Sequence, residues 1–392
     1  MDIILWDNIY NNNIWNIWKR LFSKQFYLWS ILKYIIENKG ENMKRKVIIK
    51  IIVFILVGYL LFWATTKIMI PKWTTPKDNR MTYIIKGFYK EPKNSLDVIF
   101  MGNSDVYRGI SPIALWDEYG IASYNFVSSG QRMWTAYYMM EECFRYQKPN
   151  LIVLNMDSAF NETSSSESNY RKTFDNMKMS KNKLKAITDS SFKNKKTEML
   201  SYILPLTRYH SRWNELVDKD FQQAFKNEKF DFKGMDLNTD VEPYNYDNKY
   251  MSKENSEENI GPKAYKYLEK MIDLCKENNV ELLLIELPSA DSWSKDLSNK
   301  TKEFAEQHNL RFIDMNLNYK EFGFDWKSDT ADSGDHLNIY GAEKVSKYLG
   351  KIIKEEYKIP DRKNDTNYSS WNESSVKYHE IVNKEEKNNT SK

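Results

Sequence analysis

The stretch LDVIFMGNSDVYRGISP, residues 96–112, decides the fold because it joins a strand to a helix through a short polar turn. The mostly apolar residues 96–101 are typical of a strand, and Gly-Asn-Ser follows as a tight turn. Pro112 is expected to begin a helix with Ser111 as its N-cap. Ser104 then lies just beyond the carboxyl end of a strand, where open α/β sheets bind ligands, and becomes a candidate nucleophile. Glycine and serine also occur in ordinary turns, so a partner is needed.

Apolar and amphipathic segments alternate along the rest of the chain, which predicts βαβ units and an α/β fold with a mostly parallel sheet. The strands are short and continuously apolar, as expected of a sheet covered on both faces. The expected strands are residues 96–101, 122–127, 151–156, 280–286 and 310–315, and the expected helices are residues 112–119, 131–146, 262–278, 294–308 and 339–357.

The predicted main domain covers residues 96–357 and contains a long polar insert at residues 157–261. An insert of this length between two core strands is typical of a subdomain or a lid. Within it, residues 202–217 are rich in apolar and aromatic side chains and are expected to pack on the sheet or over the site. The polar tail, residues 358–392, is expected to have little order.

Residues 47–66, VIIKIIVFILVGYLLFWATT, have the length and composition of a single transmembrane helix that contacts the lipid bilayer. Lys44, Arg45 and Lys46 precede it, which predicts a cytoplasmic segment at residues 1–46 and an extracellular C-terminal domain. No small-residue cleavage site follows the apolar run, so we expect an uncleaved anchor in the cell membrane. Residues 67–95 are interpreted as a juxtamembrane stalk.

Residues 1–42 are unusual in their tryptophans and runs of asparagine. One interpretation is an aromatic, basic helix in the inner membrane interface. The alternative, which we favour, is that the natural chain begins at Met43. Residues 39–43 back-translate to a purine-rich ribosome-binding sequence followed by a start codon, so residues 1–42 would be a mis-assigned start.

The charge balance and the cysteines exclude several classes of function. The chain has 58 basic and 54 acidic residues and a net charge of +4, too balanced to indicate nucleic-acid binding. Its two cysteines, Cys143 and Cys275, have no metal-ligand spacing and are expected to be unpaired and buried. We therefore expect no metal and no cofactor.

A base for Ser104 is expected near the end of the chain. The chain has four histidines. Of these, His336 alone closely follows two aspartates, Asp332 and Asp335, just before a predicted helix that Asn338 can cap. A histidine held at a helix start beside a carboxylate meets the requirements of a general base. A surface histidine in an Asp-rich loop is the alternative.

These two motifs, GNS at residues 102–104 and the Asp/His loop before the terminal helix, resemble those of the SGNH (GDSL-type) hydrolase superfamily. The pattern is most similar to its membrane-anchored Gram-positive members, the DltD-like and polysaccharide O-acetylation proteins. The resemblance covers residues 95–156 and 262–355. It implies a flavodoxin-like three-layer α/β/α sandwich, with Ser104 as nucleophile and His336 as base. It also implies that the backbone N–H groups of Ser104 and Gly130 bind the oxyanion.

The sequence departs from the family pattern at two places. The family acid precedes the histidine by three residues, but Ser333 stands there. We favour Asp332 as the acid, with Asp335 as the alternative, because an adjacent residue is not expected to turn its carboxylate onto its neighbour's ring. The Gly-x-Asn-Asp block is replaced by LNMDSAF, in which Asn155 and Asp157 are imperfect substitutes and Asn155 is the candidate oxyanion donor. Loss of such a donor costs about 3 kcal/mol of transition-state stabilisation.

The leading hypothesis is a membrane-anchored, extracytoplasmic serine esterase or O-acyltransferase that acts on a cell-surface glycopolymer. The resemblance implies a multi-pass membrane O-acyltransferase as partner, and Arg108 is a candidate for binding an anionic polymer. The second hypothesis is a non-catalytic SGNH-fold protein that binds or assembles envelope polymer. A secreted lipid esterase is a third and weaker hypothesis.

Overall fold

The computed structural model describes residues 41–71, 80–160, 166–189, 191, 196–225, 232–245, 250–252, 259–290 and 292–390. The chain divides into two compact units, Met1–Ile68 and Met69–Lys392. Most of residues 1–42, for which we predicted a mis-assigned start, lie outside the described residues. The first unit contains α2 (Glu41–Met69) up to Ile68, and Met69, the last residue of this helix, is the first residue of the second unit. Within α2, Arg45–Met69 is long and apolar enough to cross a membrane, and includes the predicted span at residues 47–66.

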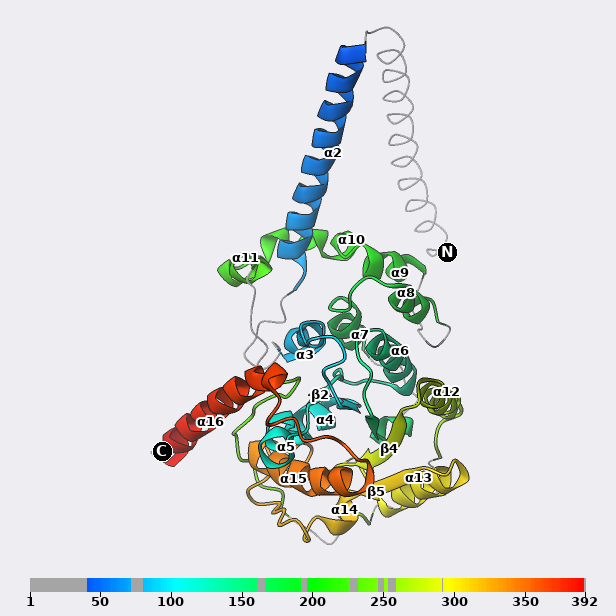
Figure 1. Cartoon of the computed structure of the whole chain (residues 1–392), viewed down its shortest axis with the longest axis vertical. Helices are drawn as coiled ribbons and strands as arrows, with labels where there is room; N and C mark the ends of the chain where they lie inside the picture. The colour runs from blue at the N-terminus through cyan, green and yellow to red at the C-terminus, as the bar shows by residue number, and fades with distance from the viewer. Residues whose placement is uncertain are drawn as a thin grey trace, which may run out of the picture. The chain divides into compact units, whose positions relative to one another are not determined.

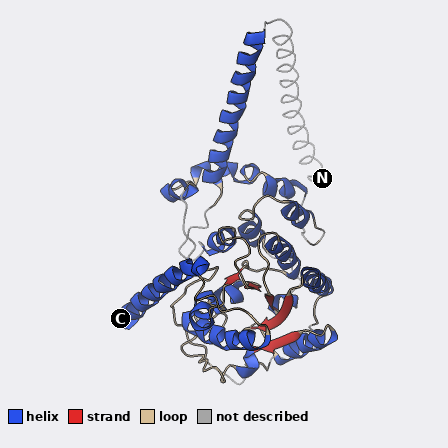
Figure 2. Cartoon of the chain, in the orientation of Figure 1, coloured by secondary structure: helices blue, strands red, loops and turns tan. Residues whose placement is uncertain are grey.

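The second unit is built on a five-stranded parallel sheet with the strand order β2-β1-β3-β4-β5, as Figure 2 shows in red. The strands β1, β2 and β3 follow the predicted apolar runs, and so do β4 and β5. The predicted α/β fold with a parallel sheet is therefore confirmed. The bounds are β1 (Val98–Met101), β2 (Ser123–Asn125), β3 (Leu151–Asn155), β4 (Glu281–Glu286) and β5 (Arg311–Asp314).

Helices cover both faces of this sheet, giving three layers (Figure 1). On one face α15 packs on α4 and α5, and on the other α6 packs on α12. Pro112 and Ser111 begin α5 as predicted, with Ser111 Oγ accepting a hydrogen bond from the Ala114 N–H, and the left-handed Gly120 ends it. The bounds are α4 (Ser104–Gly109), α5 (Pro112–Tyr119), α6 (Met133–Phe144), α12 (Pro262–Asn278), α13 (Lys295–Gln307), α14 (Met315–Asn318) and α15 (Ile339–Glu356).

The two predicted cysteines lie where α6 packs on α12. Cys143 and Cys275 are buried and form no disulfide, in agreement with their apolar surroundings in the sequence. Burial raises the pKa of both thiols, so neither behaves as a reactive thiolate near neutral pH.

The predicted stalk is wrong for its second half. Residues 80–88 form α3 (Arg80–Phe88), whose Ile84, Ile85 and Phe88 side chains are buried in the core. The Phe88 ring stacks on Phe126 with centroids 3.9 Å apart. This segment therefore extends the main domain instead of leading to it.

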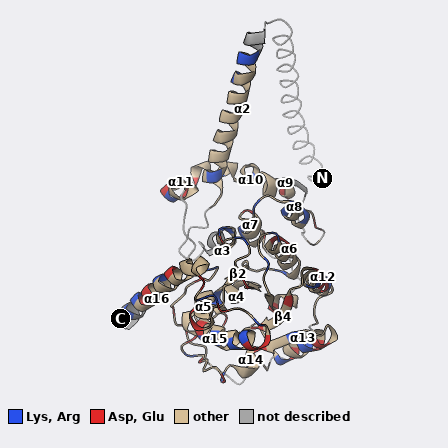
Figure 3. Ribbon diagram, viewed as in Figure 1, with Lys and Arg blue, Asp and Glu red and all other residues tan. Residues whose placement is uncertain are grey.

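The tail is also more ordered than predicted. After the short helix η3 (Thr366–Tyr368), residues Ser369–Thr390 form α16, which packs on α5. Trp371 stacks on Trp116 with centroids 5.1 Å apart, and Tyr378 is fully buried. Charged residues of both signs occur along α16 (Figure 3), which is why its composition did not indicate a helix whose inner face is anchored by aromatic side chains.

The polar insert folds into short helices, which Figure 1 labels α7 to α11 in green. After them, residues 232–245 return to the sheet and line the loops around its carboxyl end. Lys233 O accepts a hydrogen bond from Asn125 N, and Asp236 N donates one to Tyr107 O in α4. The insert bounds are η1 (Asp157–Ala159), α7 (Glu167–Phe174), α8 (Lys181–Thr188), α9 (Lys196–Ile203), α10 (Leu206–Tyr209), η2 (His210–Asn214) and α11 (Asp218–Ala224).

Candidate active site

The turn after β1 places Ser104 at the first position of α4. Asn103 caps this helix by accepting a hydrogen bond from Asp105 N at 3.0 Å, while its side-chain amide donates to Asp157. Gly102 has a φ of +152°, and a Cβ there would lie 2.6 Å from Val106 Cγ2. The turn thus requires glycine and asparagine to present Ser104 at the carboxyl end of the sheet. The predicted turn is present, but the short helix α4 was not anticipated.

His336 and Asp332 are joined by two contacts, as expected of a base and its orienting acid. Asp332 Oδ1 accepts from the His336 backbone N–H at 2.6 Å, and Asp332 Oδ2 lies 2.8 Å from ring Nδ1. The predicted cap is also present, because Asn338 Oδ1 accepts from Tyr340 N and Gly341 N at the start of α15. The ring is held at both its backbone and its Nδ1 edge.

Asp335 also reaches the ring. Its Oδ2 lies 3.0 Å from His336 Nδ1, so the expectation that an adjacent carboxylate cannot face its neighbour's ring is wrong. The physical reason is the preceding turn, in which Ser333 and Gly334 both have positive φ angles, 57° and 99°. This turn folds the loop back so that two carboxylates face one imidazole nitrogen.

Ser104 and His336 belong to neighbouring segments, but no hydrogen bond joins them. His336 Nε2 lies 3.7 Å from Asp105 Oδ1, so it faces the residue after the serine. Across the part of the chain that the structure describes, Ser104 Oγ forms no hydrogen bond. The hydroxyl is therefore available to a substrate, and Nε2 faces a carboxylate in this arrangement.

Arg108 links the two halves of the site. Its Nη1 donates to Asp332 Oδ2 at 2.8 Å, and its Nε lies 3.6 Å from Asp236 Oδ2. The side chain is only 17% exposed. Arg108 thus reaches from α4 to Asp332 in the His336 loop and to Asp236 in the returning insert, and it compensates the charge of Asp332. The sequence predicts Arg108 as a residue that binds an anionic polymer, whereas here its guanidinium contacts Asp332 and Asp236.

The three predicted oxyanion donors differ in their availability. Among the described residues, the backbone N–H groups of Ser104 and Gly130 have no acceptor. Asn155 Nδ2 instead donates to Asp157 Oδ1 at 2.9 Å and approaches Glu286 Oε1 at 3.5 Å, and its side chain is fully buried. The Asn155 amide therefore serves the neighbouring carboxylates.

A group of acidic residues lies behind the site, and only one of its members, Asp157, was singled out from the sequence. Asp105, Asp157 and Glu286 follow or end β1, β3 and β4, so they meet at one edge of the parallel sheet. Burial raises the pKa of Glu286 well above its usual range, and the charges of Asp157 and Asp105 raise it further. Burial likewise raises the pKa of Asp105 and of Asp157. Acidic residues at successive strand ends were the signal in the sequence.

These surroundings set the protonation of His336. Burial opposes its charged form, but Asp332 and Asp335 at Nδ1 and the charge of Asp105 raise its pKa to about 9. Burial also acts against the charged form of Asp332, yet its contacts with His336 hold the pKa of Asp332 below the usual value. Near neutral pH the resting site therefore contains an imidazolium beside ionised Asp332.

Within the described part of the chain, Asp332, Asp335 and His336 form a group that could hold a cation, because their ligand atoms lie within 4.8 Å of one another. Arg108 already places a guanidinium on Asp332 Oδ2. A metal ion would have to compete with that contact and with the proton on His336.

No family model and no curated protein matches the chain. Among solved structures, it is similar to a candidate acylhydrolase from Bacteroides fragilis, with 13% sequence identity and a TM-score of 0.34. The match covers 68% of this chain and 92% of that protein. At this identity and TM-score the likeness does not define an activity for this chain.

Proposed function

We propose that this chain is a membrane-anchored serine acyl-transfer enzyme of the SGNH type, from its DltD-like branch. The supporting observation is the meeting of two distant segments at the carboxyl end of the sheet. Arg108 of the Ser104 helix binds the same Asp332 oxygen that holds His336 Nδ1. In this proposal Ser104 is the nucleophile, His336 the base and Asp332 the orienting acid, and the support is that their segments meet where such sheets bind ligands.

In the proposed reaction, Ser104 Oγ attacks the carbonyl carbon of an acyl ester, and its proton passes to His336 Nε2. The oxyanion is stabilised by the N–H groups of Ser104 and Gly130. His336 then protonates the leaving alcohol, which departs and leaves an ester on Ser104. A hydroxyl of the acceptor, or water, gives its proton to His336 and attacks that ester. As the bond to Ser104 Oγ breaks, His336 returns the proton to Oγ, and the acyl group leaves on the acceptor or, with water, as the free acid.

This mechanism requires two changes from the resting site. His336 must first lose a proton and become neutral, because a positively charged imidazolium cannot accept a proton from Ser104. Nε2 must also exchange Asp105, now 3.7 Å away, for the serine hydroxyl. Asp105 and Ser104 are adjacent residues in the first turn of α4.

The proposed substrate is a cell-surface glycopolymer, and the proposed place of work is the outer face of the cell membrane. The support is the apolar segment Arg45–Met69 and the basic residues at its N-terminal end, which favour a cytoplasmic N-terminus. In this proposal a multi-pass membrane O-acyltransferase supplies the acyl group to Ser104. The acyl group is small, such as acetyl.

The test is labelling of the purified full chain with a fluorophosphonate probe, which reacts with activated serines. We expect labelling that disappears in Ser104→Ala and persists in Ser95→Ala, a serine whose Oγ only donates to Pro92 O. In cells, Ser104→Ala is expected to reduce acylation of the surface polymer. Unchanged acylation in Ser104→Ala would contradict the catalytic role.

A second candidate function is a non-catalytic SGNH-fold protein that binds envelope polymer. The observations that favour it are the occupied Asn155 amide and the contact of His336 with Asp105 in place of Ser104. In that case the probe labels neither form, and Ser104→Ala binds the polymer as tightly as the unchanged chain. Labelling together with polymer acylation separates the two functions.

A further inference from the structure

The insert carries an unusual density of exposed apolar side chains. Twelve large apolar residues are exposed among the described residues of the second unit, and seven of them lie between residues 200 and 225. Trp213 is 70% exposed, the highest value among the twelve. Soluble surfaces scatter such residues singly, so a concentration of this kind indicates an interaction surface. The seven are Leu200, Ile203, Leu204, Trp213, Val217, Phe221 and Phe225.

These side chains follow helical spacing. Leu200 and Ile203 lie on α9, and Leu204 follows its last residue, so the three are spaced as on one helical face. Val217, Phe221 and Phe225 recur every four residues along α11 and its two ends. Figure 1 shows α9, α10 and α11 in a row along one edge of the second unit, with Trp213 in η2 between α10 and α11. We call these seven residues the α9–α11 apolar face.

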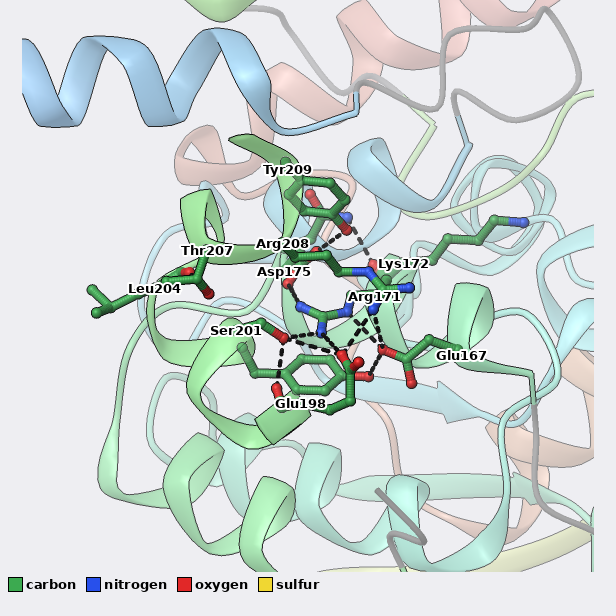
Figure 4. A network of polar contacts seen from close by, with 12 residues as sticks. Glu167, Arg171, Lys172, Asp175, Glu198, Ser201, Leu204, Thr207, Arg208 and Tyr209 are labelled. Atoms are coloured by element: carbon green, nitrogen blue, oxygen red, sulfur yellow. Dashed lines mark hydrogen bonds and ion pairs between the residues drawn. The ribbon is translucent and has the colours of Figure 1, made fainter. Parts of the chain in front are cut away.

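The opposite face of α9 and α10 is fixed by a buried ionic network (Figure 4). Arg171 of α7 is 1% exposed and lies over the Tyr202 ring, 3.6 Å from its centroid. It also contacts Ser201 and Glu198. Tyr209 OH donates to Asp175 at 2.7 Å.

The apolar and aromatic residues of the segment 202–217, which was predicted to pack inward, therefore divide into two groups. Tyr202 and Tyr209 are buried, whereas Leu204 points away from the network. For Trp213 the prediction of inward packing is wrong. The charge pairs fix the inner face against the rest of the unit. The apolar face of the same helices must therefore point outward.

The same segment contacts the chain where it leaves the candidate membrane span. Met69 is the last residue of the span Arg45–Met69, and its carbonyl accepts a hydrogen bond from Arg212. Arg212 directly precedes Trp213 and is also bound to Asp220 of α11, 3.2 Å away. If Arg45–Met69 crosses the bilayer, Arg212 and its neighbours must lie at the membrane surface.

We propose that the α9–α11 apolar face lies in the interfacial region of the lipid bilayer, as a second membrane contact beside the span. This rests on the membrane anchoring in the proposed function. The occupant is lipid because the face is continuous with the residue at which the chain leaves the span. It also carries an exposed tryptophan, which favours the headgroup level, and apolar helical faces of this kind enter about 5–10 Å into that region.

The test uses the full chain in vesicles of phosphatidylcholine and phosphatidylglycerol without other proteins. Cys143 and Cys275 are buried, so a single introduced cysteine can be labelled with an environment-sensitive fluorophore. The probe positions on the face are Leu204→Cys, Trp213→Cys and Phe221→Cys. The matched controls are Leu317→Cys and Val376→Cys, which are exposed by 59% and 60% outside the face. Phe54→Cys reports the span.

We expect a blue shift in emission at all three face positions. We also expect stronger quenching by nitroxides near the headgroup end of the acyl chain than by nitroxides near its methyl end. The two controls are expected to be quenched by aqueous iodide alone. Each variant must keep the far-UV circular dichroism of the unchanged chain, and the three face positions test the same face independently.

Face probes that behave like Leu317→Cys while Phe54→Cys is quenched by lipid nitroxides would overturn the proposal and leave anchoring intact. Face probes shielded from both iodide and lipid nitroxides would also overturn it, because they indicate a second copy of the chain on the face. A Phe54→Cys probe without lipid quenching would instead refute the anchoring itself, and the membrane contact with it.

Discussion

Asp332 holds His336 by two separate oxygens, one on the backbone N–H at 2.6 Å and one at ring Nδ1 at 2.8 Å. Asp335 approaches the same Nδ1 at 3.0 Å but makes no contact with the backbone N–H in the described structure. The two carboxylates therefore have different roles. Asp332 fixes the position of the ring, whereas Asp335 adds charge beside it.

The first prediction concerns these two aspartates. Asp332→Asn is expected to lower kcat for a chromogenic acetyl ester by roughly 10²- to 10⁴-fold, because the ring loses its orienting carboxylate. Asp335→Asn is expected to cause a smaller loss, since Asp332 remains. Steady-state kinetics on both variants, with far-UV circular dichroism as the folding control, provide the measurement. An equal or larger loss in Asp335→Asn would show that the acid has been assigned to the wrong residue.

The pH dependence follows from the raised pKa of His336. Catalysis needs the neutral imidazole, so kcat/KM is expected to rise with pH until His336 loses its proton near its pKa of about 9. Asp335→Asn removes a negative charge from Nδ1 and is expected to move the profile to lower pH.

The matched control for the pH profile is Asp117→Asn. Asp117 lies 2.8 Å from His379 on α16, so this substitution removes a carboxylate from beside a histidine outside the site. This control should not shift the profile. A profile that is flat between neutral pH and pH 9 would be inconsistent with His336 as the base.

A third prediction distinguishes two roles for Arg108. The positive charge of Arg108 lowers the pKa of His336. Arg108→Gln is therefore expected to shift the pH profile of kcat/KM to higher pH, with little change in KM. Arg145→Gln, which removes a half-exposed arginine paired with Glu142, is the control. If KM for an anionic polymer rises while the profile stays in place, Arg108 binds substrate, as we first expected from the sequence.

The parallel sheet could be predicted because its strands are continuous apolar runs that leave few alternatives. α16 was missed because its average composition is polar. The signal was positional: Trp371, Ser374, Tyr378 and Val382 are all buried and recur at helical spacing. α3 was missed for a related reason. Its buried face consists of only three residues, and it follows a predicted membrane span in the sequence, where a stalk was expected.

The site could be predicted as far as residue types and their order along the chain allow. Ser104, Asp332 and His336 were placed at sheet and helix ends, which sequence patterns indicate well. The reach of Asp335 could not be predicted, because it depends on the left-handed Ser333 and Gly334. The Asn155 contact depends on the burial of Glu286, a property of the sheet rather than of the local sequence.

The last prediction concerns the stability contributed by α16. Trp371 is 2% exposed and stacks on Trp116, whose Nε1 donates to Asn372 Oδ1 at 3.0 Å. Trp371→Ala is expected to lower the free energy of unfolding by about 3–5 kcal/mol, because it removes a large buried aromatic side chain and leaves a cavity. Val376→Ala, on the exposed face of the same helix, should change it by no more than about 0.5 kcal/mol. Urea unfolding of the full chain in detergent, followed by circular dichroism, gives both values. Equal midpoints for the two variants would mean that α16 does not pack on α5 in solution, and the expectation of a tail with little order would return.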